Sequence, residues 1–116
     1  MAFAGHGADV GVKATADADG RFTLALDVSD RDPSAPRVAW IRLRLRVSKG
    51  EAFYGLGERH DAVNQRGKYR AMQIEPDGEV ETLYNEAHVP VPLLVGTRGW
   101  GTFVETKRVG AFDVAR

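Results

Sequence analysis

Two pairs of carboxylates are close together in the sequence, Glu58 with Asp61 and Glu75 with Asp77. Two facing carboxylates can act as acid and nucleophile in the cleavage of a glycosidic bond. The chain has 16 acidic residues, so pairs at this spacing arise by chance, and closeness along the chain does not set the distance between two carboxyl groups. We therefore assign neither pair a catalytic role.

Residues 53–59 contain two glycines in a pattern found in phosphate-binding turns. His60 stands where a dinucleotide-binding turn has its third glycine, and no helix-forming sequence follows to point its N-terminus at a phosphate. The segment instead predicts a bulge, or a close approach of two backbones, at the end of a strand.

Potential metal ligands are dispersed. The three histidines are far apart, and none has a second histidine at metal-binding spacing: His6, His60 and His88. Asp17 and Asp19 before Gly20 suggest a calcium loop, but the bidentate carboxylate that such a loop requires downstream is missing. We predict a turn at this position, and no metal ion or other cofactor.

Several aromatic side chains could stack on sugar rings, although packing in a core is the simpler interpretation of each: Tyr54, Tyr69, Tyr84 and Trp100. Arg42, Arg44 and Arg46 form a row typical of a solvated strand face, or of an interface with acidic residues of another domain. Trp40 has the same parity, which indicates that this face is partly covered.

The elements that position these residues have the period of β-strands, with apolar residues alternating between scattered glycines and prolines. Residues 10–29 predict a hairpin with its turn at Asp19-Gly20. One face of its second strand is apolar: Phe22, Leu24, Leu26 and Val28. Residues 38–47 alternate between apolar and basic side chains and predict another strand. Its register should be well specified, because a shift of one residue would bury three guanidinium groups.

Further strands are expected at residues 52–56, 69–75, 80–84, 91–96, 101–106 and 110–115, with turns at Asp77-Gly78 and residues 97–99. Residues 61–66 have room for one short helical turn, and no longer helical pattern occurs. The predicted fold class is all-β: an antiparallel β-sandwich in one domain over residues 1–116, or a truncated part of a larger sandwich.

Composition excludes several classes of partner. The chain has 116 residues, equal numbers of basic and acidic residues and no cysteine, so we expect no nucleic acid or anionic membrane as a partner and no disulfide. No signal peptide or membrane span is evident, which favours a cytoplasmic location. A (β/α) barrel of about 250 residues cannot fit in this length.

From Glu51 onward the chain resembles the N-terminal, galactose-mutarotase-like β-sandwich domain of glycoside hydrolase family 31, which includes α-glucosidases and α-xylosidases. The resemblance rests on an ordered series of motifs: residues 53–58 (FYGLGE), residues 64–67 (NQRG), Tyr84, Pro92, residues 98–104 (RGWGTFV) and Phe112-Asp113. The chain departs from the family where Met72 and Ile74 replace a usual tryptophan, Leu93 an aromatic residue and Trp100 a tyrosine.

The resemblance implies a division of labour. Family members are retaining α-glycosidases whose two catalytic aspartates lie in a following (β/α) barrel, so this chain should contribute no catalytic residue and be inactive alone. The resemblance also implies a loop that reaches the barrel mouth, where an acidic residue binds sugar hydroxyls. Asp77 matches that residue best, with Glu75 as its neighbour. One carboxylate can accept hydrogen bonds from two hydroxyls and so fix the sugar ring.

Two alternatives to a glycosidase domain remain open. The chain could be a stand-alone carbohydrate-binding sandwich, or a structural module that forms subunit contacts through its arginine row. A truncated sandwich exposes strand edges, so we also expect marginal stability or self-association.

Overall fold

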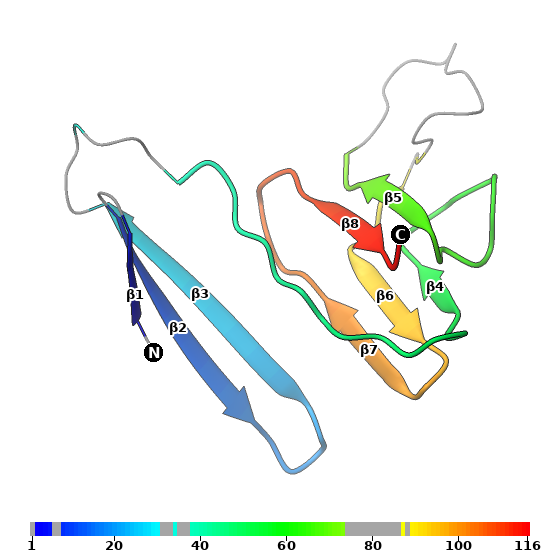
Figure 1. The fold of residues 1–116 in the computed structure, drawn as a ribbon, viewed down its shortest axis with the longest axis horizontal. Helices are drawn as coiled ribbons and strands as arrows, with labels where there is room; N and C mark the ends of the chain where they lie inside the picture. Colours follow the sequence, from blue (N-terminus) through cyan, green and yellow to red (C-terminus); the bar gives the residue numbers. More distant parts are fainter. Residues whose placement is uncertain (1, 6–7, 31–33, 35–37, 74–86, 88) are drawn as a thin grey trace. The chain divides into compact units, whose positions relative to one another are not determined.

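The computed structural model describes residues 2–5, 8–30, 34, 38–73, 87 and 89–116. These residues contain eight β-strands, all paired antiparallel, and no helix (Figure 1). The predicted all-β antiparallel class is therefore confirmed. The described segments include no helix long and apolar enough to cross a membrane. The chain divides into two compact units, Met1–Arg44 and Leu45–Arg116.

The first unit contains one sheet with the strand order β1-β2-β3. Its strands are β1 (Ala2–Gly5), β2 (Ala8–Ala16) and β3 (Phe22–Asp30). The predicted hairpin is confirmed as β2 and β3, whereas β1 was not predicted. In the turn, Asp17 Oδ1 accepts hydrogen bonds from the N–H groups of Asp19 (3.1 Å) and Arg21 (2.9 Å). Asp17 therefore acts as a turn-forming residue, as expected.

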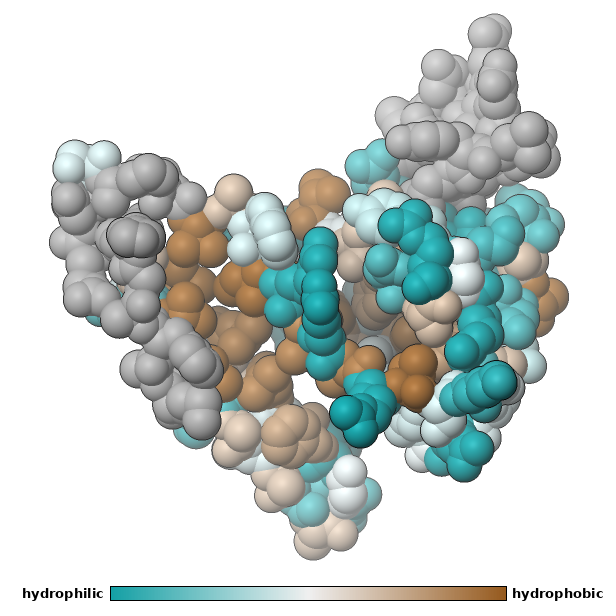
Figure 2. Space-filling model, viewed as in Figure 1, coloured by the Kyte–Doolittle hydropathy of each residue, from teal (hydrophilic) through white to brown (hydrophobic). Residues whose placement is uncertain are grey.

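The hairpin has one apolar face, because the register places Val10 opposite Val28 and Val12 opposite Leu26. The predicted parity of β3 is therefore correct. Phe22 is 66% exposed on this face, so the face is only partly covered. Brown, hydrophobic residues are accordingly open to view in Figure 2.

The second unit contains a sheet with the order β4-β6-β7 and a two-stranded sheet, β5-β8. The strands are β4 (Phe53–Gly55), β5 (Lys68–Ala71), β6 (Leu93–Gly96), β7 (Trp100–Phe103) and β8 (Ala111–Val114). The core lies between them and is formed by Phe53, Leu56, Leu94 and Val114. Complete burial of a side chain such as Phe53 or Leu56 contributes about 1.5–3 kcal/mol.

The sheet β4-β6-β7 also has an apolar outer face. Alternation puts Phe53, Leu94 and Trp100 on the core side and the intervening side chains on the other side. We call these intervening side chains the outer face, and each is at least 40% exposed: Tyr54, Leu93, Val95 and Phe103. This sheet is therefore apolar on both sides.

The predicted strand at residues 38–47 is wrong for the described residues. These residues belong to no strand, and Ile41, Leu43 and Leu45 are about half exposed. Alternation specifies which side chains share a face, but a strand also needs a hydrogen-bonded neighbour, and the described part of the chain supplies none. Trp40 is 70% exposed, with the Arg42 guanidinium 5.1 Å from its ring centroid, so no described residue of this chain covers it.

Five further predicted strands occur in shortened form, with β5 and β7 beginning one residue earlier than predicted, and the turn at residues 97–99 joins β6 to β7 as expected. The short helical turn at residues 61–66 does not form. The backbone carbonyls of Ala62 and Val63 instead accept hydrogen bonds from the Gln65 side chain (2.7 and 3.3 Å). The predicted strand at 80–84, Tyr84 and the Asp77-Gly78 turn lie outside the described residues.

Candidate functional site

The two predicted substrate-binding residues, Glu75 and Asp77, lie outside the described residues. The described residues Ala71, Met72 and Gln73 precede the segment that carries them, and Ala87 and Val89 follow it. Residues 56–59 contact described residues on both sides of this segment, Ala71 before it and Val89 after it.

Residues 53–58 form the base of the site. Phe53 and Leu56 are fully buried in the core, while the backbone between and after them turns sharply, with positive φ at Gly55, Leu56 and Gly57. The Leu56 N–H donates to the Leu93 carbonyl (2.8 Å), and the Glu58 N–H donates to the Val89 carbonyl (3.2 Å). The segment thus runs beside residues 89–93.

Gly57 confirms the predicted close approach of two backbones. Its φ is 87°, and a β-carbon on it would overlap the Val89 carbonyl oxygen and lie 2.7 Å from the Val91 nitrogen. These neighbours are backbone atoms, which cannot move aside as a flexible side chain can. Only glycine satisfies both the conformation and the space.

Residues 64–67 fasten this turn to the start of β4. Asn64 Oδ1 accepts hydrogen bonds from the N–H groups of Phe53 and Arg66, both at 3.1 Å, and the Gln65 N–H donates to the Phe53 carbonyl (2.8 Å). Arg66 reaches the other way and donates to the carbonyls of Glu51 (2.8 Å) and Ser48 (3.3 Å). The two motifs recognised in the sequence are therefore in direct contact.

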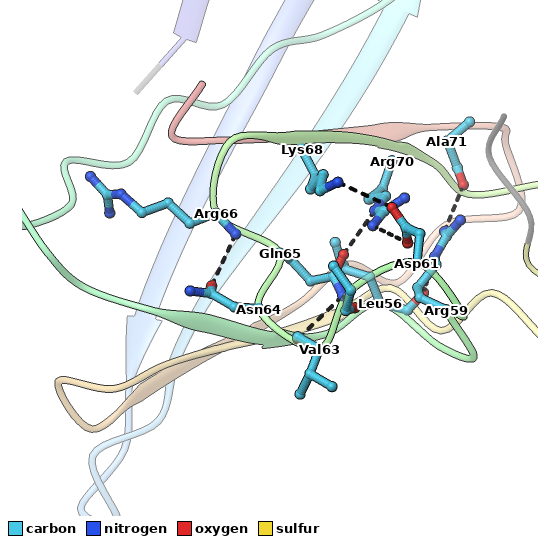
Figure 3. Close-up of polar contacts among 11 residues, drawn as sticks. Leu56, Arg59, Asp61, Val63, Asn64, Gln65, Arg66, Lys68, Arg70 and Ala71 are labelled. Atoms are coloured by element: carbon cyan, nitrogen blue, oxygen red, sulfur yellow. Dashed lines mark hydrogen bonds and ion pairs between the residues drawn. The ribbon is translucent and has the colours of Figure 1, made fainter. Parts of the chain in front are cut away.

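A polar network centred on Asp61 joins the loop at residues 57–67 to β5 (Figure 3). Asp61 accepts hydrogen bonds from Arg70 (2.6 Å) and Lys68 (3.2 Å), and Arg70 also donates to Gln65 Oε1 (2.8 Å). Arg70 and Gln65 are almost fully buried. Burial alone raises the pKa of Asp61, but the hydrogen bonds from Arg70 and Lys68 outweigh it and hold the pKa below its usual value. Asp61 is therefore an ionised structural residue.

Arg59 links the turn to the end of β5. Its Nε donates to the Leu56 carbonyl (3.2 Å), and one terminal nitrogen donates to the Ala71 carbonyl (3.1 Å) (Figure 3). Burial lowers the pKa of Arg59, and the nearby Arg70 charge lowers it further, while Asp61 opposes both. An arginine remains charged at neutral pH after such a shift, so both hydrogen bonds carry a charged donor.

Glu51 precedes β4 and is buried, and its carboxylate accepts a hydrogen bond from Trp100 Nε1 at the start of β7. Hydrogen bonding by the Ser48 N–H lowers its pKa most strongly, burial opposes this, and the Trp100 indole and the Arg98 backbone lower it further. The Trp100 ring packs against Phe53 with centroids 5.9 Å apart. The core interpretation is therefore confirmed for Trp100.

His6, Tyr84 and His88 lie outside the described residues, and the other candidates that the structure describes are on the surface. Tyr54 and Tyr69 are 42% and 55% exposed, so the core interpretation is wrong for both. Glu58 and His60 are half exposed and 3.9 Å apart. Among the described residues, no three His, Asp or Glu side chains converge as metal ligands.

Sequence reasoning did not identify Arg59, Gln65 or Arg70 as polar anchors. One signal was available for Arg70, because it lies between Tyr69 and Ala71 in a predicted strand. A charged residue at an inward position requires a partner of opposite charge nearby, and Asp61 is the acidic residue that supplies it.

Comparison with known proteins places the chain in a wider context. The sequence model of the glycosyl hydrolase 31 N-terminal galactose mutarotase-like domain matches residues 8–113. A 1,3-alpha-isomaltosidase of Kribbella flavida is 32% identical over 71 residues, which is 58% of this chain and 10% of that protein. No solved structure matches.

Proposed function

The chain belongs to the family of glycosyl hydrolase 31 N-terminal galactose mutarotase-like domains, and we therefore propose that it is the non-catalytic N-terminal domain of a retaining α-glycosidase that hydrolyses O-glycosyl bonds. The observation that carries this proposal is the family match over residues 8–113. In this proposal the domain packs on a (β/α) barrel that supplies both catalytic aspartates.

The described residues support a positioning role rather than a catalytic one. Asp61 is ion-paired with Arg70 and Lys68, and its lowered pKa makes it unsuitable as a general acid at neutral pH. A glycosidase needs one protonated and one ionised carboxyl group on either side of the scissile bond. We propose that the barrel, not this domain, provides that pair.

The contribution that we propose for this domain is a substrate-binding segment between Gln73 and Val89. Asp77, with Glu75 beside it, would accept hydrogen bonds from sugar hydroxyls at the barrel mouth. The hydrogen bonds of residues 56–59 to Ala71 and Val89 support this role, because a binding group acts with precision only when both ends of its segment are held.

The substrate class that we propose is an α-linked oligosaccharide. The related Kribbella flavida protein is named a 1,3-alpha-isomaltosidase, so isomalto-oligosaccharides are the first compounds to test. Because the match covers 10% of that relative, the substrate of the parent protein is a proposal that depends on the barrel as much as on this domain.

The first experiment is the intact mass of the native gene product, compared with 12.7 kDa for this chain. We expect a product longer by at least about 250 residues, which leaves room for the barrel. The purified product should hydrolyse nitrophenyl α-glucosides or isomalto-oligosaccharides with retention of configuration, and the 116-residue chain alone should not. A native product of 12.7 kDa, or a longer product without α-glycosidase activity, contradicts the proposal.

A further inference from the structure

Residues 38–47 have the alternation of a strand but no neighbouring strand, and we call them the unpaired segment. None of their backbone N–H or C=O groups has a hydrogen-bond partner among the residues that the structure describes. Residues 38–46 are exposed, whereas Val47 packs against the core of the second unit. An exposed backbone with a strand pattern and unused donors and acceptors is a template for pairing with another strand.

The two sides of the unpaired segment differ in chemistry. One set of alternate positions is basic and the set between them is apolar: Arg42, Arg44 and Arg46 against Ile41, Leu43 and Leu45. In a paired strand the two sets face opposite sides of the sheet. A partner strand that keeps apolar residues beside apolar ones therefore places its other side chains opposite three guanidinium groups. Opposite charges at such cross-strand positions are favourable, so the partner that fits alternates acidic and apolar residues.

A second copy of the unpaired segment does not fit. Any register that brings the apolar positions of two copies together also brings their arginines together, and like charges directly opposite each other are destabilising. The related Kribbella flavida protein extends far beyond the matched part, which is 10% of its length. A strand from outside these 116 residues is therefore the source that the observations favour.

The second unit is open beside the end of the unpaired segment. Leu45, Arg46 and Trp100 line a hollow of about 250 Å³, and the Trp100 ring packs on Phe53 in the core. The hollow is smaller than typical small-molecule sites, which measure roughly 300–1,000 Å³. Its size and lining suit a side chain of an adjoining strand better than a separate ligand.

We propose that the unpaired segment is completed by one strand of the parent polypeptide from outside these 116 residues, a strand that alternates acidic and apolar side chains. Its carboxylates pair with Arg42, Arg44 and Arg46, and its backbone satisfies the donors and acceptors of the segment. This inference rests on the proposed function, because it requires a longer parent protein. It adds to that function the place where the rest of the polypeptide joins the strands of this domain.

The test is amide hydrogen exchange, measured by mass spectrometry on the purified native gene product and on the 116-residue chain. In the 116-residue chain the amides of residues 41–47 should exchange nearly as fast as in an unfolded peptide. In the native product they should exchange at least about 100-fold more slowly, because strand pairing protects them. The amides of β6 (Leu93–Gly96) report in both samples whether the second unit is folded.

The outcomes separate this inference from the proposed function. Equally fast exchange of residues 41–47 in a longer, active α-glycosidase would overturn the inference and leave the proposed function intact. Protection in the 116-residue chain would also overturn it, since the partner would then be this chain itself or, if protection appears only at high concentration, a second copy. A native product of 12.7 kDa contradicts the proposed function and, with it, the inference.

Arg44→Glu in the native product tests the acidic character of the partner. It should speed exchange of residues 41–47 at least about tenfold, because it places like charges across the pair. Arg44→Gln removes the charge without reversing it and should have a smaller effect. The matched control is Lys49→Glu, which makes the same charge change at an exposed position outside the segment and should alter these rates by less than about twofold. Equal rates in Arg44→Glu and Lys49→Glu would overturn the inference.

Discussion

Gly96 and Trp100 face each other across the turn of β6 and β7, and the indole occupies the space beside the Gly96 α-carbon. A β-carbon at residue 96 would lie 2.6 Å from Trp100 Cε2 and 2.6 Å from Glu51 Oε1. The missing side chain at Gly96 is what allows Trp100 Nε1 to donate its 2.6 Å hydrogen bond to Glu51. The packing of Gly96, Trp100 and the buried Glu51 is therefore interdependent.

Gly96→Ala should displace the indole and destabilise the 116-residue chain by about 1–3 kcal/mol, the usual range for overpacking. Gly101→Ala is the control in the neighbouring strand, because a β-carbon there meets only ordinary contacts at 3.7 Å or more. Urea unfolding and tryptophan fluorescence measure the two effects. Similar stability of the two variants would show that the indole is not held as described.

Gly57→Ala should destabilise the chain by at least about 3 kcal/mol, because strain at positive φ adds to overlap with the backbone of residues 89–91. Gly67→Ala separates the two contributions. Gly67 has a φ of 79°, but nothing lies within 4 Å of its β-carbon position, so about 1–2 kcal/mol is expected. Comparable unfolding free energies for the two variants would contradict the close approach at Gly57.

Asp61→Asn should cost about 1–3 kcal/mol, because it leaves the buried Arg70 guanidinium without its charged partner. The control is Asp113→Asn, which removes an exposed pair with Arg116 at 3.6 Å and should change stability by less than about 0.5 kcal/mol. Chemical denaturation of both variants gives the comparison. An effect of Asp61→Asn as small as that of the control would exclude Asp61 as an anchor.

Acid should destabilise the chain through Glu51 and Asp61, whose pKa values are both lowered in the folded state. The stability that each contributes is complete above the pKa of the unfolded chain, about 4 for such groups, and is lost as the pH falls through the lower folded pKa. We expect the denaturation midpoint to decline below about pH 4. Glu51→Gln should make this loss of stability with falling pH less steep. Parallel curves of stability against pH for the variant and the native chain would contradict the contribution of Glu51.

The outer face of β4-β6-β7 should promote self-association of the isolated chain, because its four apolar side chains are each at least 40% exposed. Sedimentation velocity at increasing concentration should show dimers or larger species. Val95→Lys places a charge in the centre of this face and should shift the distribution to monomer. A native chain that remains monomeric at all concentrations contradicts the prediction.

The sequence predicted most of the strands because period-two alternation is a local property. The hairpin of β2 and β3 carries both its pattern and its turn residues within a single stretch of chain, so its existence and the apolar face of its second strand could be predicted from them. Residues 38–47 have an equally regular pattern but form no strand. Pairing depends on a second stretch of chain, and the pattern does not show where that stretch lies.

The polar anchors were harder to predict for a related reason. Asp61 and Arg70 are nine positions apart, and the sequence places Asp61 nearer to Glu58 than to Arg70. Only the folded chain brings the Asp61 carboxylate to 2.6 Å from the buried Arg70 guanidinium. Burial of Arg70 is possible because Gln65 and Asp61 accept hydrogen bonds from its guanidinium. The sequence does not show that these three side chains meet.

The crowded turn at residues 53–59 has a consequence for recognising this domain in other genomes. Phe53 and Leu56 are restricted by volume, Gly57 by the absence of space for a β-carbon, and Arg59 by the need to reach two carbonyls. These restrictions are independent of one another. The number of seven-residue sequences that could replace residues 53–59 is therefore the product of the few residue types allowed at each restricted position. A short stretch of chain can therefore carry enough information to reveal kinship between proteins that differ at most other positions.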